Sequence, residues 1–80
     1  MNLTPKDIQK LIRTAVQTRK FAFVPRSNHK VGASVLTRGR KIFGGCNVES
    51  VISGLGTCAE RHAIDHAIAH GEYTIRAMCT

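Results

Sequence analysis

The stretch 57–61, Thr-Cys-Ala-Glu-Arg, opens an amphipathic helix that we predict to run from Cys58 to His70. At about 3.6 residues per turn, its apolar residues form one stripe, made of Ala63, Ile64, Ala67 and Ile68. Glu60 falls in the middle of this stripe, and a carboxylate that points inward is costly unless something pairs with it. Cys58 lies at the helix N-terminus, where unpaired N–H groups and the helix dipole favour a thiolate. A thiolate next to an inward carboxylate indicates a metal site with an acid–base group beside it.

Two structural alternatives fit the same residues. Thr57 and Glu60 match a capping box, in which the glutamate reaches back to the backbone N–H of the capping residue. Cys58 alone could be a small buried hydrophobic residue. The segment before the helix favours a functional interpretation, because Asn47 and Glu49 share a face if the preceding strand continues through them. An amide and a carboxylate together suit a small ligand with several hydroxyl groups, although both could be ordinary loop residues.

The rest of the chain predicts one further helix and three strands. Thr4-Pro5-Lys6-Asp7 is a strong helix start, with a capping residue, a proline at the first position and an acid in the first turn. Apolar residues follow at helical spacing, and we expect all of them in the core: Ile8, Leu11, Ile12, Ala15 and Val16. Strands are expected at 31–36, 41–46 and 73–80, the first two as a hairpin that turns at 37–40. The order helix, strand, strand, helix, strand predicts an α/β fold.

Composition limits the classes of protein to which the chain can belong. Eighty residues without tryptophan form at most one domain, with an aliphatic core. Three cysteines, an odd number, and no secretion signal indicate a reduced, cytoplasmic setting. No apolar run reaches membrane-spanning length, so we expect no membrane association. The net charge of +7 could serve nucleic-acid binding, but the basic residues are scattered and aromatic residues are few, which does not favour that role.

Three histidines, His62, His66 and His70, recur every four residues and share one face of the predicted second helix. This face lies opposite the apolar stripe, so we expect it to point to solvent. Histidine pairs at this spacing can bind a metal. His62 and His66 could instead contribute to a subunit interface.

Three motifs occur in order along the chain: 27–33, Ser-Asn-His-Lys-Val-Gly-Ala; 45–49, Gly-Cys-Asn-Val-Glu; and 58–61, Cys-Ala-Glu-Arg. Together they resemble the N-terminal part of the small cytidine deaminases, zinc enzymes that have cysteine where related deaminases have histidine. The resemblance implies a mixed sheet between layers of helices, in the order α-β-β-α-β, and a single domain at 1–80 that is incomplete at its C-terminus. It also implies hydrolytic deamination of cytidine or deoxycytidine to uridine or deoxyuridine, in pyrimidine salvage, by a homotetramer with active sites at subunit contacts.

The resemblance assigns roles to individual residues. Cys58 matches a zinc ligand, and Glu60 matches the residue that takes a proton from zinc-bound water and passes it to the base. Asn47 and Glu49 match residues that hold the hydroxyl groups of the ribose. Arg61 matches an arginine that offsets the charge of a zinc site built from thiolates.

Three departures from the family pattern bear on function. His29 stands where relatives usually place a phenylalanine that packs on the pyrimidine ring, and Ser53 stands where an aromatic residue is typical. We expect His29 to stack on the base as a substrate-binding residue, with a weaker apolar contact than a phenylalanine makes. The Pro-Cys-x-x-Cys segment that supplies the other zinc ligands is absent from these 80 residues, and Cys79 could be either a replacement ligand or a buried structural thiol.

The missing ligands leave two functional hypotheses. The first is a cytidine deaminase completed by a C-terminal segment or by further copies of the chain. The second is a non-catalytic, deaminase-like fragment that binds a partner or a nucleotide and holds no zinc.

Overall fold

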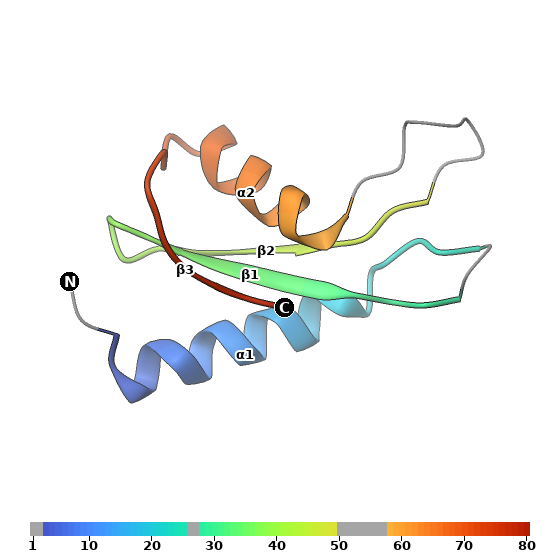
Figure 1. Cartoon of the computed structure of the whole chain (residues 1–80), viewed down its shortest axis with the longest axis horizontal. Helices are drawn as coiled ribbons and strands as arrows, with labels where there is room; N and C mark the ends of the chain where they lie inside the picture. Colours follow the sequence, from blue (N-terminus) through green and yellow to red (C-terminus); the bar gives the residue numbers. More distant parts are fainter. Residues whose placement is uncertain (1–2, 26–27, 50–57) are drawn as a thin grey trace.

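The computed structural model of this chain describes residues 3–25, 28–49 and 58–80. Its elements are α1 (Pro5–Arg19), β1 (Gly32–Thr37), β2 (Ile42–Cys46), α2 (Ala59–Ala69) and β3 (Ile75–Cys79). The strands form one sheet in the order β2-β1-β3, and β1 pairs antiparallel with both neighbours. α1 covers one face of this sheet and α2 the other (Figure 1). The predicted α/β order, with a sheet between helix layers, is therefore confirmed.

The start of α1 is built as predicted. The backbone N–H of Asp7 donates to Thr4 Oγ1 at 3.1 Å, and the Thr4 N–H donates to Asp7 Oδ2 at 3.0 Å. Pro5 occupies the first turn, where a missing N–H costs nothing. Arg40, in the turn between β1 and β2, donates to both oxygens of the Asp7 carboxylate at 3.0 and 2.9 Å. These contacts tie the hairpin turn to the beginning of α1.

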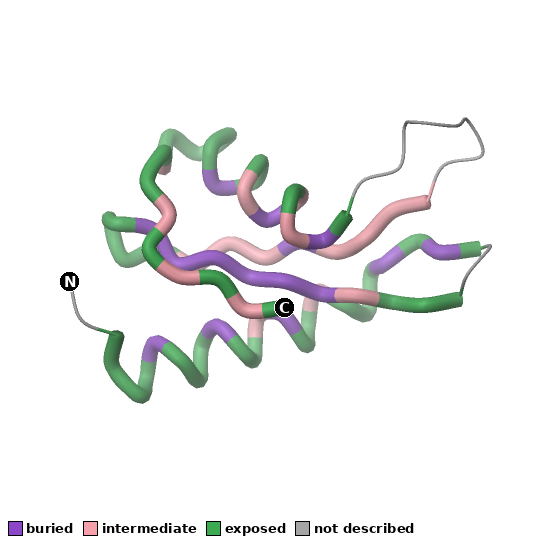
Figure 2. Tube along the Cα trace, viewed as in Figure 1, coloured by how far each residue is buried: buried purple, intermediate pink, exposed green. Residues whose placement is uncertain are grey.

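The apolar stripe of α1 is only partly core. Leu11 and Ala15 are buried, whereas Ile8, Ile12 and Val16 remain about half exposed, at 47%, 50% and 50%. The expectation that the whole stripe is buried is therefore wrong. The reason is geometric, because the sheet covers one side of the stripe, and within the described residues nothing covers the other side (Figure 2).

Every residue of β1 is buried, since both faces of this central strand are covered. Ala33 and Val35 pack with the alanines of α2, and Ser34 turns to the other face, where its hydroxyl donates to the Leu11 carbonyl of α1 at 2.6 Å. That hydrogen bond satisfies a polar side chain that is otherwise fully buried.

Glycines allow both helices to approach the sheet closely. A Cβ atom added at Gly45 would lie 2.6 Å from Ala59 O and 2.9 Å from Ala63 Cα. A Cβ atom at Gly32 would lie 2.8 Å from Arg19 Cβ on the α1 side. Contacts this short leave no room for a side chain, so these two positions set how near each helix lies to its strand.

The buried face of α2 agrees with the predicted stripe at Ala63 and Ala67, and at Ile64, which is half-buried against the core, but not at Ile68. The fully buried residues are Ala59, Ala63 and Ala67, while Ile68 is 45% exposed. Glu60 is half-buried and borders this alanine row instead of lying in its middle. Hydrophobicity favours the isoleucines as the inner face, but the short distance to Gly45 admits only alanine. No helix within the described residues has the length and apolar character needed to cross a membrane.

Candidate functional site

Cys58 and Glu60 both lie at the start of α2. Cys58 is the N-cap residue, has extended backbone (φ −76°, ψ 158°), and is exposed. Its carbonyl accepts from the His62 N–H at 3.1 Å, and its side chain makes no capping hydrogen bond. Because the helix begins at Ala59, Glu60 is the second helical residue, one position short of the capping-box glutamate. The capping-box alternative is therefore wrong for Glu60, and Thr57 itself lies outside the described residues.

Asn47 holds together the end of β2 and the segment that enters β1. Its Oδ1 accepts from the Val31 N–H at 2.9 Å, and its Nδ2 donates to the His29 carbonyl at 2.9 Å. Its own N–H donates to the Val31 carbonyl at 3.1 Å. The structure thus brings Asn47 and His29 together, as two predicted substrate-binding residues require, across a sequence separation that no local pattern indicates.

The strand does not continue through Asn47 and Glu49 as the face argument requires, because β2 ends at Cys46. The chain turns there to pair with the segment that follows α1. Phe23 N–H donates to the Asn47 carbonyl at 3.1 Å, and Glu49 N–H donates to the Phe23 carbonyl at 2.7 Å, forming an isolated parallel bridge. Glu49 is half-buried and His29 is exposed.

These segments gather at one end of the molecule. The end of β2, the start of α2 and the segment between α1 and β1 lie at the same end of the sheet (Figure 1). Arg61 is nearby in sequence but exposed, and its Nε lies 3.9 Å from Asp65 Oδ2, with the two side chains 76% and 58% exposed. So long and open a pair holds Arg61 only weakly. Ser53 lies outside the described residues.

The described residues do not make a complete metal centre. Within 3–25, 28–49 and 58–80, no three histidine, cysteine or acidic side chains are grouped so that they could hold a metal ion. A catalytic zinc takes three protein ligands, and Cys58 is the ligand that the sequence predicts at this end of the sheet. A zinc site therefore does not fit the described residues by themselves.

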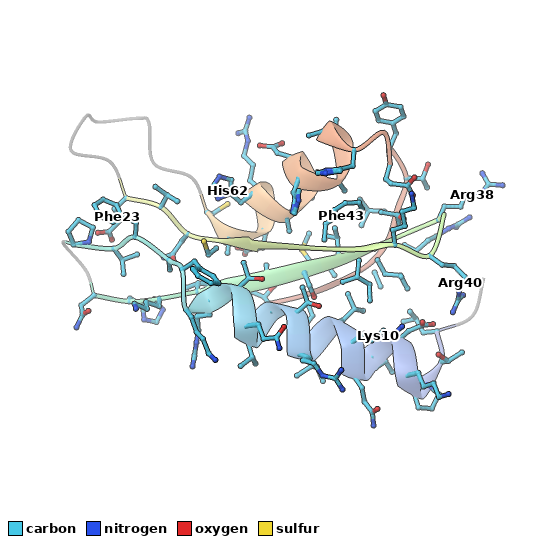
Figure 3. The ribbon with its side chains drawn as sticks, turned by 180° about the vertical axis from the view of Figure 1, so that it is seen from behind. Lys10, Phe23, Arg38, Arg40, Phe43 and His62 are labelled. Atoms are coloured by element: carbon cyan, nitrogen blue, oxygen red, sulfur yellow. The ribbon has the colours of Figure 1, made fainter. Side chains whose placement is uncertain are left out.

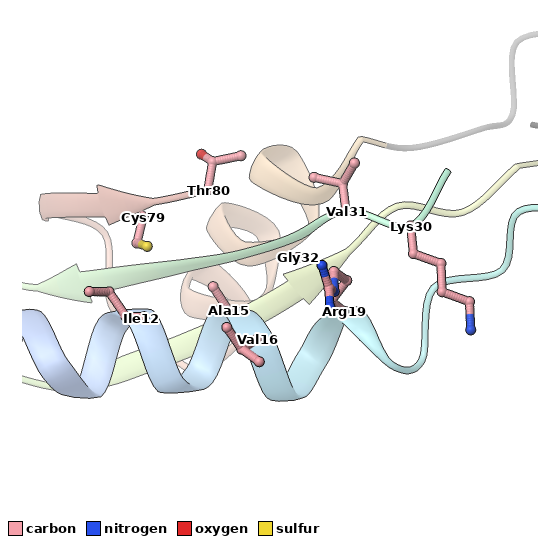
Figure 4. A pocket seen from close by; sticks show the side chains of 9 residues that line it. All are labelled: Ile12, Ala15, Val16, Arg19, Lys30, Val31, Gly32, Cys79 and Thr80. Carbon is pink, nitrogen blue, oxygen red and sulfur yellow. The ribbon is translucent and has the colours of Figure 1, made fainter. Parts of the chain in front are cut away.

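Cys79 does not supply a second ligand to Cys58. It pairs with Ser34 in the sheet, and Ser34 faces α1. Cys79 accordingly lines a pocket against Ile12 and Val16 of α1 (Figure 4), whereas Cys58 belongs to the helix on the opposite face. The structure supports the structural-thiol alternative for Cys79, and all three cysteines of the chain are unpaired.

The histidine face of α2 packs along β2. His62 Nδ1 lies 2.8 Å from the Cys46 carbonyl, and His66 Nδ1 lies 3.0 Å from the Gly44 carbonyl. The rings of His66 and His70 lie 5.1 and 5.2 Å from the ring of Phe43. The expectation of a solvent face is wrong for His62, which is half-buried (labelled in Figure 3).

The physical reason is the position of β2 at the edge of the sheet. The outward carbonyls of an edge strand have no partner strand. A protonated Nδ1 of His62 or His66 satisfies them and covers the edge. The edge position of β2 depends on strands that are distant in the sequence, so the spacing of the histidines alone could not identify this role.

Comparison with known families identifies one matching model, described as the cytidine and deoxycytidylate deaminase zinc-binding region, which covers residues 5–80. The chain is 39% identical over 72 residues to a cytidine deaminase of Halalkalibacterium halodurans, covering 90% of this chain and 54% of that protein. It is 38% identical over 76 residues to a probable cytidine deaminase of Dictyostelium discoideum, covering 95% and 52%. The chain thus spans about half the length of the curated relatives that it matches.

Solved structures give the same result. A crystal structure of cytidine deaminase from Burkholderia pseudomallei superposes with a TM-score of 0.82 at 41% identity, covering 95% of this chain and 59% of that chain. A crystal structure of cytidine deaminase from Mycobacterium tuberculosis superposes with a TM-score of 0.84 at 35% identity, covering 90% and 58%.

Proposed function

Because this chain belongs to the cytidine and deoxycytidylate deaminase family, we propose that it contributes two parts of a cytidine deaminase. These are a nucleoside-binding wall, made of His29, Asn47 and Glu49, and the proton carrier, Glu60. The reaction replaces the amino group at C4 of cytidine or deoxycytidine with oxygen from water, giving uridine or deoxyuridine and ammonia. The observation that carries this proposal is the fixed side chain of Asn47, at the end of the sheet where α2 begins. The cellular role would be pyrimidine salvage in the cytoplasm.

Asn47 is oriented before any ligand binds. An amide has two N–H donors and two acceptor positions, and backbone contacts within the described residues use one of each. The remaining N–H and lone pair are therefore held in a defined direction, suited to a ribose hydroxyl. A fixed polar group avoids the cost of ordering it on binding. Glu49 would accept from a second hydroxyl, and His29 would stack on the base.

Glu60 would carry the proton in this reaction. It is half-buried beside the alanine row of α2, so its carboxylate is partly shielded from solvent yet reachable. In this role it takes a proton from the attacking water and delivers it to the cytosine ring. When bound, zinc would supply a water of lowered pKa.

Zinc binding would require ligands besides Cys58. We propose that they come from a complementing C-terminal segment or from partner subunits of a homo-oligomer, a tetramer by analogy with the family. Arg61, weakly held by Asp65, would be free to offset the charge of a thiolate cluster.

A second candidate is a non-catalytic member of the family that binds a partner or a nucleotide and holds no zinc. It is favoured by the lack of a three-ligand group within the described residues. Zinc content and cytidine turnover of the chain, purified with whatever it assembles with, discriminate between the two. Stoichiometric zinc with turnover supports the deaminase, and a folded assembly with neither supports the second candidate.

Matched variants assign the individual roles. Cys58→Ala should lose zinc, whereas Cys46→Ala, which removes a half-buried thiol one residue before Asn47, should keep it. Glu60→Gln should keep zinc and lose deamination, whereas Asp65→Asn on the exposed side of the same helix should keep both. Full turnover by Glu60→Gln would refute the proton-carrier role.

A further inference from the structure

α1 carries a row of positive charge on its outer face. The residues of this row recur at alternating intervals of four and three, so their side chains lie on one side of the helix. We refer to these exposed residues as the basic stripe: Lys6, Lys10, Arg13 and Lys20, with Gln17 at the one neutral position. At about 1.5 Å per residue, the stripe is about 21 Å long. In sequence the basic residues look scattered, and the helix gathers them.

The basic stripe is separate from the two other faces of α1. Leu11 faces the sheet, and Ile12 and Val16 turn toward the pocket beside β3. The acid of the helix, Asp7, does not neutralise the stripe, because its side chain is only 11% exposed and is occupied by Thr4 and Arg40.

The hairpin turn extends the positive surface at the N-terminal end of the stripe. Arg40 and the stripe residues Lys6 and Lys10 line one surface pocket, and Lys10 and Arg40 lie at the same end of the molecule (Figure 3). Lys41 follows in the turn and is also exposed. The other four acids of the chain all lie outside α1 and this turn. The stripe thus concentrates positive charge, whereas the charge of Arg40 is offset by Asp7, which lines the same pocket.

We propose that the basic stripe binds the phosphate backbone of a polynucleotide. A straight row of four cations about 21 Å long runs along about six steps of a duplex axis, at about 3.4 Å each, and can contact up to four phosphates. The stripe has no aromatic residue to stack on bases, so binding rests on phosphate contacts and is independent of base sequence. The exposed apolar residues Ile12 and Val16 turn toward the pocket beside β3 and not toward the stripe, which favours a polynucleotide over a membrane.

The stripe lies on the opposite side of the sheet from α2 (Figure 1). A polynucleotide held there would not reach Cys58 or Glu60, so the stripe is a docking surface and not part of the deaminase site. The inference stands whether or not the chain deaminates cytidine, and neither zinc nor cytidine should affect the binding.

The test is fluorescence anisotropy of a labelled 20-nucleotide single strand and a 20-base-pair duplex, titrated with the chain over a range of salt concentrations. Two variants lower the net charge equally, from +7 to +5. Lys10→Gln/Arg13→Gln removes charge from the stripe, and Arg61→Gln/Arg76→Gln removes exposed charge from α2 and β3, away from α1 and the hairpin turn. Circular dichroism confirms that both variants fold.

We expect the stripe variant to lose about ten-fold or more in affinity at 0.1 M salt. The slope of log K against log salt should fall by about one for each removed contact. The control variant should lose less than about three-fold by the same reasoning. Equal losses in both variants would overturn the proposal, because binding would then depend only on total charge. Tighter binding to phosphatidylserine vesicles or to polyglutamate than to either polynucleotide would overturn it in favour of a membrane or an acidic protein.

Discussion

Substituting Gly45 with alanine should push α2 away from the sheet and lower the stability of the chain. The added Cβ would lie 2.6 Å from Ala59 O and 2.9 Å from Ala63 Cα, where ordinary contacts begin at 3.4 Å. The nearest atom of all is the backbone N of Ala63, and clearing Ala59 O alone requires the helix to move by about 0.8 Å. Overpacking of this kind costs about 1–3 kcal/mol. The atoms in the way belong to the backbone, so shortening a side chain with Ala63→Gly should not rescue the variant.

Thermal unfolding followed by circular dichroism measures this cost. A loss of about 2 kcal/mol lowers Tm by about 8–16 °C in a domain of this size. Gly71→Ala is the matched control, because it makes the same change where an added Cβ meets nothing within 4 Å. Its cost comes only from the left-handed backbone, φ 84°, and is about 1 kcal/mol. If Gly45→Ala lowers Tm no more than Gly71→Ala does, the close approach of α2 to β2 is refuted.

Three further predictions concern single side chains. The pKa of Asp7 lies below its ordinary value, chiefly because the backbone N–H at the helix cap donates to it. The stability of the folded chain should therefore fall as the pH drops below about 4. Asp7→Asn should flatten the dependence of the urea midpoint on pH between about 5 and about 2. His62→Ala should cost about 1 kcal/mol in urea unfolding and promote association through the uncovered strand edge. His70→Ala loses a hydrogen bond within its own helix and a ring contact with Phe43 but uncovers no carbonyl of β2, so it should cost less. Asn47→Asp should lower stability by about 1–3 kcal/mol, since it replaces a donor facing the His29 carbonyl with an acceptor; an unchanged urea midpoint would contradict the bracing role.

Features encoded within a few residues could be predicted from the sequence. The start of α1 depends on Thr4, Pro5 and Asp7, which lie within one turn and satisfy each other. The end of α2 near Gly71 follows in the same way from local backbone preference. Strand and helix order followed from periodicity, because burying one face of each element is the main constraint on the chain.

Features that depend on distant segments could not be predicted. Periodicity predicted a buried stripe of Ala63, Ile64, Ala67 and Ile68. The structure centres the buried face on the alanines and leaves Ile68 half exposed, because Gly45, far away in sequence, brings the sheet too close for larger residues. The sequence indicated a ligand-binding role for Asn47 but not its hydrogen bonds to the backbone, because its partners Val31 and His29 lie 16 and 18 residues away. The edge position of β2 explains His62, and it becomes visible only once the strands are ordered.

The contact between Gly45 and Ala59 also determines how the proposed proton carrier faces the nucleoside-binding wall. Gly45 lies two residues before Asn47, and Ala59 lies next to Glu60, so the two proposed functional groups are each within two residues of one backbone contact. A rigid contact at this point therefore sets their separation. Displacing α2 by about 0.8 Å at Ala59 exceeds the tolerance of about 0.5 Å for a working catalytic arrangement. In an active assembly, Gly45→Ala should therefore lower kcat far more than Gly71→Ala does at a temperature where both variants are folded, and equal kcat values would show that the contact does not set the separation.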